Sequence, residues 1–255
     1  MSAPPVTKGG GAVAEAERAC ARCEASLKQV LGRTSGDRRC KYLRAAIDRA
    51  IAPDDSDGHA EERAAAAKIH DGQPLPHFRI LCKMCGDRGP EGVARAFFGD
   101  DPVPSVTLCA NRLFGDAEVA EALVHELVHA YDYVAQGYDL SESPYLACSE
   151  VRAAREAECH ELPFFCPSGA DLAATVGTPV TKVKEDADDP KSYMTEPSPI
   201  HRMCNWWHRR CVRMNATKAT SSMVPVDVAH DCVAQVFEEC YANNAPFDHV
   251  DDADA

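Results

Sequence analysis

The sequence lacks three features, and each absence excludes a class of protein. It has no basic excess, because 27 Lys and Arg residues stand against 40 Asp and Glu residues, giving a formal net charge of −13. A nucleic-acid-binding domain presents a basic face, so we expect no nucleic acid partner. No run approaches the roughly 18 consecutive apolar residues of a membrane-spanning helix, and no internal repeat is visible. We therefore expect a non-repetitive globular protein.

The first twenty residues, MSAPPVTKGGGAVAEAERAC, also lack recognisable targeting signals. They contain neither the basic and apolar regions of a secretory signal nor the Arg-rich amphipathic pattern of a matrix-targeting peptide. A Pro-Pro pair and three consecutive glycines occur near the start, and both favour irregular chain. We expect residues 1–19 to form a flexible N-terminal segment.

Cysteine, in contrast, is abundant, with 13 residues spread over most of the chain. Such a density indicates disulfide bonds formed in an oxidising compartment. The alternative is structural zinc, because Cys20 with Cys23 and Cys82 with Cys85 form two C-x-x-C pairs, and four thiolates can hold zinc. The 58 residues between the two pairs far exceed the usual spacing, which favours disulfides. Because the count is odd, at least one thiol should lie outside any intramolecular disulfide.

Hydrophobic periodicity predicts an α+β fold that is mostly helical with a small sheet. At 255 residues and 45% hydrophobic content, we expect a single domain over 20–250, followed by an acidic tail at 251–255. Residues 161–199 are rich in Pro, Gly, Thr and Asp, and should form an irregular insertion. Two strands are predicted at 77–85 and 104–110, and helices at 16–51 (broken at 32–36), 61–69, 117–136 (stopped by Gly137), 145–160, 201–216 and 226–242.

The helix predicted at 117–136 contains the sequence HELVH. Residues four apart lie on one helical face, so His125 and His129 can reach the same ion, and imidazole nitrogen suits zinc. Glu126 lies about 100° around the helix axis from His125, which is too far for an equal ligand. It is well placed to take a proton from the water that zinc activates. The motif therefore predicts a zinc-dependent endopeptidase with Glu126 as its catalytic base.

The same helix carries a separate packing face. Leu123, Leu127, Tyr131 and Val134 recur at helical spacing and should face the core. In zinc peptidases an edge strand beside the metal-binding helix holds the substrate, and the strand PSVTLCA at 104–110 is the expected edge strand.

A catalytic zinc site needs a third protein ligand and an open position for water. Asp132 follows His129 by three residues on the same face, whereas Glu150 lies in the next predicted helix, which returns after Gly137. Three ligands on one straight helix would span about 10 Å along the axis, which strains a tetrahedral site. This favours Glu150 as the ligand and leaves Asp132 as the alternative, otherwise suited to orienting an imidazole.

Two further groups are weaker candidates for function. Arg152 could pair with a carboxylate or stabilise a developing oxyanion, and the simple ion pair is favoured. A second zinc site is the less favoured interpretation of four residues with metal-like spacing, namely His201, Cys204, His208 and Cys211.

Several segments occur in an order that resembles a known family. These are ILCKMC, VTLCAN, HELVHAYD, ACSEVRAA with Cys159 closing that helix, CVR at 211–213, DCVAQVFEEC and APFD at 245–248. The set resembles the mitochondrial inner-membrane metalloproteases that act on the precursor of an ATP synthase membrane subunit, a family that includes a vertebrate Ku-binding protein. The resemblance covers about residues 20–250.

The resemblance implies a zincin-like metallopeptidase domain with zinc ligands His125 and His129 and catalytic Glu126. It also implies internal disulfides, a location in the mitochondrial intermembrane space peripheral to the inner membrane, and an ATP synthase subunit precursor as the protein substrate. The family is further credited with ATP synthase assembly, so an assembly chaperone whose proteolysis is secondary is the alternative function.

The sequence also departs from the family pattern. The stretch 91–101 lacks the family's Gly-Gly-Tyr/Phe pattern, and the insertion at 161–199 is longer than expected. Cys20, Cys166 and Cys204 have no clear family counterparts. These departures leave the zinc motif intact and concern the choice of substrate.

Overall fold

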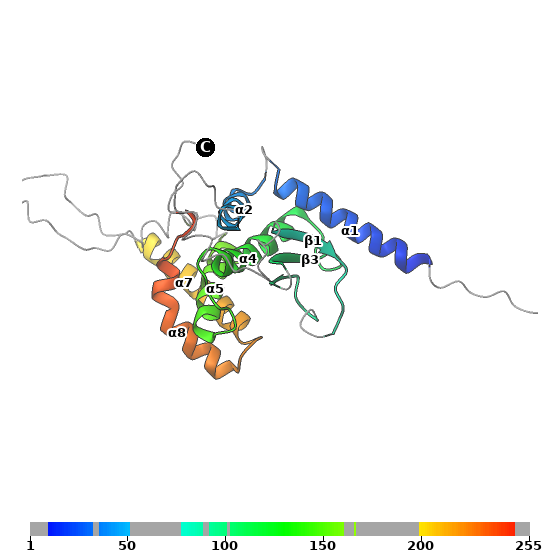
Figure 1. Cartoon of the computed structure of the whole chain (residues 1–255). Coiled ribbons are helices and arrows are strands. Elements are labelled where there is room, and N and C mark those ends of the chain that lie inside the picture. Colours follow the sequence, from blue (N-terminus) through cyan, green and yellow to red (C-terminus); the bar gives the residue numbers. More distant parts are fainter. Residues whose placement is uncertain are drawn as a thin grey trace, which may run out of the picture. The chain divides into compact units, whose positions relative to one another are not determined.

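The structure is a computed structural model that describes residues 10–32, 36–51, 78–88, 92–100, 103–160, 166 and 199–247. The chain divides into two compact units, residues 1–138 (unit 1) and 139–255 (unit 2), which are described separately (Figure 1). The helix predicted at 61–69, most of the insertion and the acidic tail lie outside the described residues. Of the helices in the described ranges, none combines the length and apolarity needed to cross a bilayer.

In its described residues, unit 1 has three helices and three strands. In chain order they are α1 (Gly10–Val30), α2 (Arg38–Ile51), β1 (Arg79–Lys83), β2 (Ala96–Gly99), β3 (Ser105–Cys109) and α4 (Asp116–Val134). The break between the first two helices is confirmed. Helix α1, however, begins at Gly10, inside the segment 1–19 that was expected to be flexible. The stretch AVAEAERA explains the earlier start, because Ala, Glu and Arg are strong helix formers.

The three strands form one sheet in the order β1-β3-β2. Strand β3 pairs parallel to β1 and antiparallel to β2, with Val106 opposite both Ile80 and Phe98. The prediction that residues 104–110 provide an edge strand is therefore wrong. A continuous run of buried residues over 106–109 marks a strand covered on both faces, and the sheet edges are β1 and β2.

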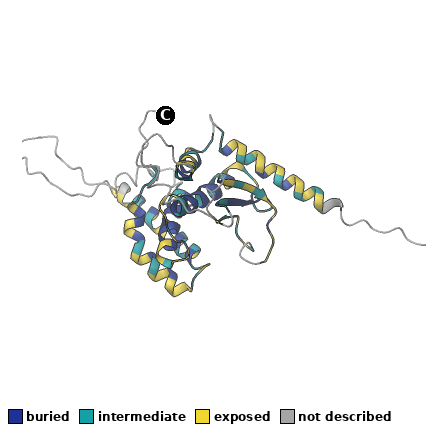
Figure 2. Ribbon diagram, in the orientation of Figure 1, coloured by how far each residue is buried: buried dark blue, intermediate teal, exposed yellow. Residues whose placement is uncertain are grey.

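Helix α4 is the central element of unit 1 and packs on α1, α2, β2 and β3. Figure 2 shows it as buried along most of its length. The predicted packing face is confirmed for Leu123, Leu127 and Tyr131, which are buried, while Val134 is half-buried. The helix ends at Val134, two residues before the predicted end at 136. Gly137 follows with a positive φ of 69°, and the Tyr138 N–H donates to the Asp132 carbonyl at 2.9 Å.

Two disulfides cross-link unit 1. Cys23 on α1 is joined to Cys82 on β1, and Cys85 after β1 is joined to Cys109 on β3. Three of the four C-x-x-C thiols are therefore used, and the fourth, Cys20, is a free thiol. The disulfide interpretation is confirmed for these motifs, and the structural zinc alternative is wrong.

Unit 2 is helical over its described residues and consists of α5 (Ser143–Glu156), α7 (Pro199–Thr220) and α8 (Val226–Ala242). These helices match the three predicted for this part of the chain, and all three pack on one another. Helix α5 ends four residues before the predicted end at 160, because the chain turns over residues 157–159.

Three disulfides cross-link unit 2. Cys148 on α5 is joined to Cys240 on α8, and Cys159 after α5 is joined to Cys211 on α7. The remaining pair consists of Cys166 and Cys204, two of the cysteines without family counterparts. Of the 13 cysteines, only Cys20, Cys40 and Cys232 are free, which confirms that some thiols lie outside disulfides. Cys204 and Cys211 are both in disulfides and cannot bind zinc as thiolates. The less favoured interpretation of a second zinc site is therefore wrong.

The core of unit 2 buries a histidine in its neutral form. His208 on α7 is fully buried, and its Nδ1 forms a hydrogen bond with the hydroxyl of Tyr241 on α8. Burial, together with the positive charge of Arg155, lowers the pKa of His208 to about 4. Burial also raises the pKa of Tyr241 to about 12. This pair therefore stays uncharged near neutral pH.

We expect His208 to make the stability of the protein depend on pH. The unfolded chain binds a proton at this residue below pH 6.5, whereas the folded chain does so only near pH 4. Its contribution is complete above pH 6.5 and is lost as pH falls towards 4, by up to about 3 kcal/mol. Urea unfolding across this window should show a smaller loss for His208→Gln than for the wild type. His230→Gln, at an exposed position on α8, is the control. Equal pH slopes in wild type and His208→Gln would contradict this assignment.

We also expect the disulfide between α5 and α8 to contribute strongly to stability. Replacing Cys148 and Cys240 together by Ala should lower the free energy of unfolding by about 2–4 kcal/mol, because the bond restricts the unfolded chain. The matched control is Cys232→Ala, which removes a free thiol from the same helix. Urea denaturation without reductant measures both effects, and equal stability of the two variants would refute the expectation.

Candidate metal centre

Helix α4 brings the two predicted histidines together within unit 1. His125 and His129 lie one helical turn apart, with ring centroids 4.8 Å from each other and ring planes at 77°. His129 is buried at 7% exposure, and His125 is half-buried. The buried leucines Leu123 and Leu127 hold the helix in the core and thereby fix the direction of the histidine face.

The neighbouring acidic residues of the motif are also buried. Glu126 is only 9% exposed, and Asp132 is fully buried near the C-terminal end of the same helix. Glu150, the predicted third ligand, belongs to α5 in unit 2 and is 6% exposed. Carboxylates are seldom buried unless they are paired or bind a metal, so each of these positions indicates a specific partner.

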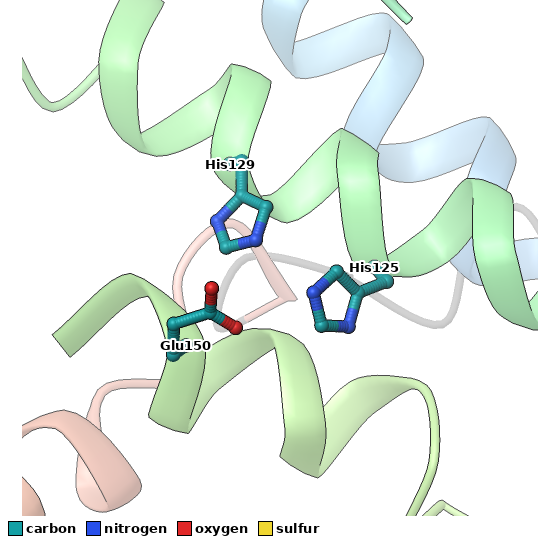
Figure 3. A group of neighbouring side chains, drawn as sticks. All are labelled: His125, His129 and Glu150. Carbon is teal, nitrogen blue, oxygen red and sulfur yellow. The ribbon is translucent and has the colours of Figure 1, made fainter. Parts of the chain in front are cut away.

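Three of these side chains form a group that can hold a metal ion. His125, His129 and Glu150 each offer one ligand atom, and these atoms lie within 4.8 Å of one another. Figure 3 shows the two imidazoles and the Glu150 carboxylate directed towards a common point. Asp132 is not a member of this group. Two imidazole nitrogens and one carboxylate oxygen are donors that suit zinc, and three protein ligands leave a fourth position for water or substrate.

Arg152 and Arg155, which follow Glu150 on α5, both donate hydrogen bonds to backbone carbonyls at or after the end of α8. Arg152 donates to the carbonyl of Ala245, and Arg155 donates to the carbonyl of Asn243 at 2.9 Å. Both guanidinium groups are buried and anchor the chain after α8 to α5. The sequence interpretation singled out Arg152 but missed Arg155. The spacing of three residues, which places both on one helical face, was the available signal.

Comparison with known proteins adds the family context. Residues 63–170, which include α4 and α5, match the family model described as Peptidase M76 family. This confirms the family resemblance. The family name denotes peptidases, and the matched range contains all three residues of the candidate metal centre.

Curated relatives carry a consistent name. The chain is 27% identical over 177 residues to the "Mitochondrial inner membrane protease atp23" of Sclerotinia sclerotiorum, which covers 67% of this chain and 60% of that protein. It is 26% identical over 155 residues to the human "Mitochondrial inner membrane protease ATP23 homolog", covering 59% of this chain and 50% of the human protein. The relative from Lodderomyces elongisporus is 33% identical over 81 residues, covering 32% of this chain and 31% of that protein.

The chain thus matches about a third to three fifths of the length of these relatives. No solved structure matches the chain, so the expectation of a zincin-like fold stays a prediction. The mostly helical α+β architecture and the disulfide-rich character are confirmed.

We expect the metal-binding group to respond differently to two carboxylate substitutions. In titrations of metal-free protein with zinc as the probe ion, His129→Ala and Glu150→Ala should each weaken binding severely, because each removes a ligand. Asp132→Asn should weaken it only about 10–100-fold, the range for residues that orient a ligand. His230→Ala, at an exposed histidine on α8, is the control. Loss of binding in Asp132→Asn with retention in Glu150→Ala would reverse the assignment.

Proposed function

We propose that the protein is a zinc metalloendopeptidase in which His125, His129 and Glu150 hold the ion. The single observation that supports this most strongly is the convergence of two imidazoles and one buried carboxylate. A His-His-Glu set with an open fourth position is a ligand arrangement of catalytic zinc sites. The similarity of residues 63–170 to a peptidase family supports the same chemistry.

In this proposal each residue of the motif has a distinct task. Zinc, when bound, supplies a Lewis acid that polarises the scissile carbonyl and makes a water molecule nucleophilic near neutral pH. Glu126 takes the proton from the attacking water and passes it to the leaving amine. Its burial on α4 limits contact with bulk water, which strengthens its electrostatic interactions with the reacting groups.

We further propose that the protein acts in the mitochondrial intermembrane space, peripheral to the inner membrane. The curated relatives are named as mitochondrial inner membrane proteases. Five disulfides fit a compartment that permits thiol oxidation. The family resemblance suggests an ATP synthase subunit precursor as substrate, and a part in ATP synthase assembly.

We expect Glu126→Gln to retain zinc and fold but to lower the rate of peptide cleavage by at least about a hundredfold, because the general base is lost. Glu121→Gln is the matched control on the same helix. It breaks only a surface ion pair with Arg95, and such pairs contribute little. Cleavage of an unfolded protein substrate, together with zinc content, measures both variants.

Near-normal cleavage by Glu126→Gln would show that another group is the base. If this variant loses cleavage in vitro but still supports ATP synthase assembly in cells, the chaperone function becomes the primary one. Loss of zinc from the variant would leave the general-base assignment without support.

A further inference from the structure

Helix α7 carries charged side chains of one sign only, in a chain that is acidic overall. Its sequence, PIHRMCNWWHRRCVRMNATKAT, contains five Lys and Arg residues and no Asp or Glu. The whole chain has 27 basic and 40 acidic residues. A helix with only basic charges in such an acidic chain creates a local positive potential that attracts an anionic partner.

The exposed face of α7 is also rich in large apolar side chains. One side of the helix is buried and carries Cys204, His208, Val212, Ala216 and Thr220 at intervals of four residues. The opposite side exposes a stripe of apolar and basic residues at helical spacing. The stripe consists of Ile200, Met203, Trp207, Arg210, Met214 and Lys218.

The apolar surface continues beyond this stripe. Trp206 lies next to it at 56% exposure, and Trp207 is 50% exposed. Met223 in the turn after α7 and Val226 at the start of α8 are exposed as well. Of the 14 large hydrophobic residues that are exposed in the described ranges, eight lie between residues 200 and 228: Ile200, Met203, Trp206, Trp207, Met214, Met223, Val226 and Val228.

A hollow of about 760 Å³ between α7 and α8 adds further positive charge to this surface. Its lining includes Arg209, Arg210, Arg213 and Lys218 but no acidic residue. Arg209 forms an ion pair with Glu238, which also lies 3.9 Å from Arg213. Among the described residues, Arg210 and Lys218 have no carboxylate within ion-pair distance. Their charges are therefore available to an anionic partner.

We propose that the exposed face of α7 is the surface by which the protein binds an anionic phospholipid bilayer. Tryptophan is enriched at membrane–water interfaces, and a helix with Trp and Met on its outer face beside Lys and Arg is typical of interfacial attachment. The Lys and Arg stems lie along the apolar surface while their charged ends reach lipid phosphates.

Shape favours a bilayer over an acidic peptide. The stripe from Ile200 to Lys218 extends about 27 Å along the helix axis, on the side opposite the buried residues. A flat surface can contact an exposed stripe over its whole length, whereas the hollow between α7 and α8 is lined on α7 only from Trp206 to Lys218. The inference rests on the inner-membrane location proposed above, but it does not depend on peptidase activity.

The two tryptophans allow a direct test. The chain contains only two, and both lie on this surface. Intrinsic fluorescence of the purified full chain therefore reports contact at α7. Vesicles of phosphatidylcholine with phosphatidylglycerol should shift the emission to the blue and sediment with the protein. Vesicles of phosphatidylcholine alone should do neither, and added salt should weaken binding because it screens the charges.

Two double variants test the two components of the surface. Arg210→Gln with Lys218→Gln should lower vesicle partitioning about 30-fold, because each basic residue near an anionic surface contributes roughly fivefold. Met203→Ser with Met214→Ser should lower it by more than about tenfold through lost apolar burial. The matched control is Arg22→Gln with Lys28→Gln, which removes the same charge from exposed positions on α1 and should partition like the wild type.

Three outcomes would overturn the proposal. Wild-type protein could fail to bind anionic vesicles, or the α1 variant could lose as much binding as the α7 charge variant. Alternatively, soluble polyglutamate could shift the emission while vesicles do not, which would make the surface an acidic-peptide site.

Cleavage of an unfolded soluble substrate without vesicles, measured on the same variants, should be unchanged. A protein that binds vesicles but cleaves nothing would disprove the peptidase proposal and leave this one standing.

Discussion

Helix α4 must present the histidines of the candidate metal centre and fill a hydrophobic core at the same time. Its buried residues pack against two helices and two strands, and this packing fixes the direction in which His125 and His129 point. The helical repeat makes the two tasks compatible, because residues four apart share a face and leave the other side free for packing. The positions of α1, α2 and the sheet within unit 1 all follow from covering this one helix.

Unit 2 must accommodate polar side chains in its core. Its described helices bury a neutral histidine and two arginines, groups that a hydrophobic core normally excludes. His208 is accommodated because Tyr241 forms a hydrogen bond with it, and Arg155 because the backbone carbonyls after α8 accept its N–H groups. Covalent cross-links between α5, α7 and α8 help to hold these polar contacts in place.

The sequence predicted those parts of the protein that depend on local periodicity. The histidine pair, the packing face of α4 and the three helices of unit 2 follow from the 3.6-residue repeat, which acts within a few residues. The order of the strands does not follow from this repeat, because β3 becomes the central strand only by pairing with two other segments of the chain. The disulfide between Cys166 and Cys204 could not be predicted either, since cysteine spacing does not determine connectivity. The grouping of Glu150 with the histidines was anticipated by a steric argument, whereas the role of Arg155 depends on a segment almost 90 residues away and was missed.

The three disulfides of unit 2 are nested. The bond between Cys166 and Cys204 lies inside the loop closed by Cys159 and Cys211, which lies inside the loop closed by Cys148 and Cys240, with separations of 38, 52 and 92 residues. Once the innermost bond exists, the middle bond closes a ring in which only 14 further residues are flexible, the difference between 52 and 38. Loop-closure entropy depends on the flexible length, so each outer bond restricts the unfolded chain less than its full separation suggests. The stabilities that the three bonds confer are therefore coupled, and the contribution of any one depends on which of the others has already formed.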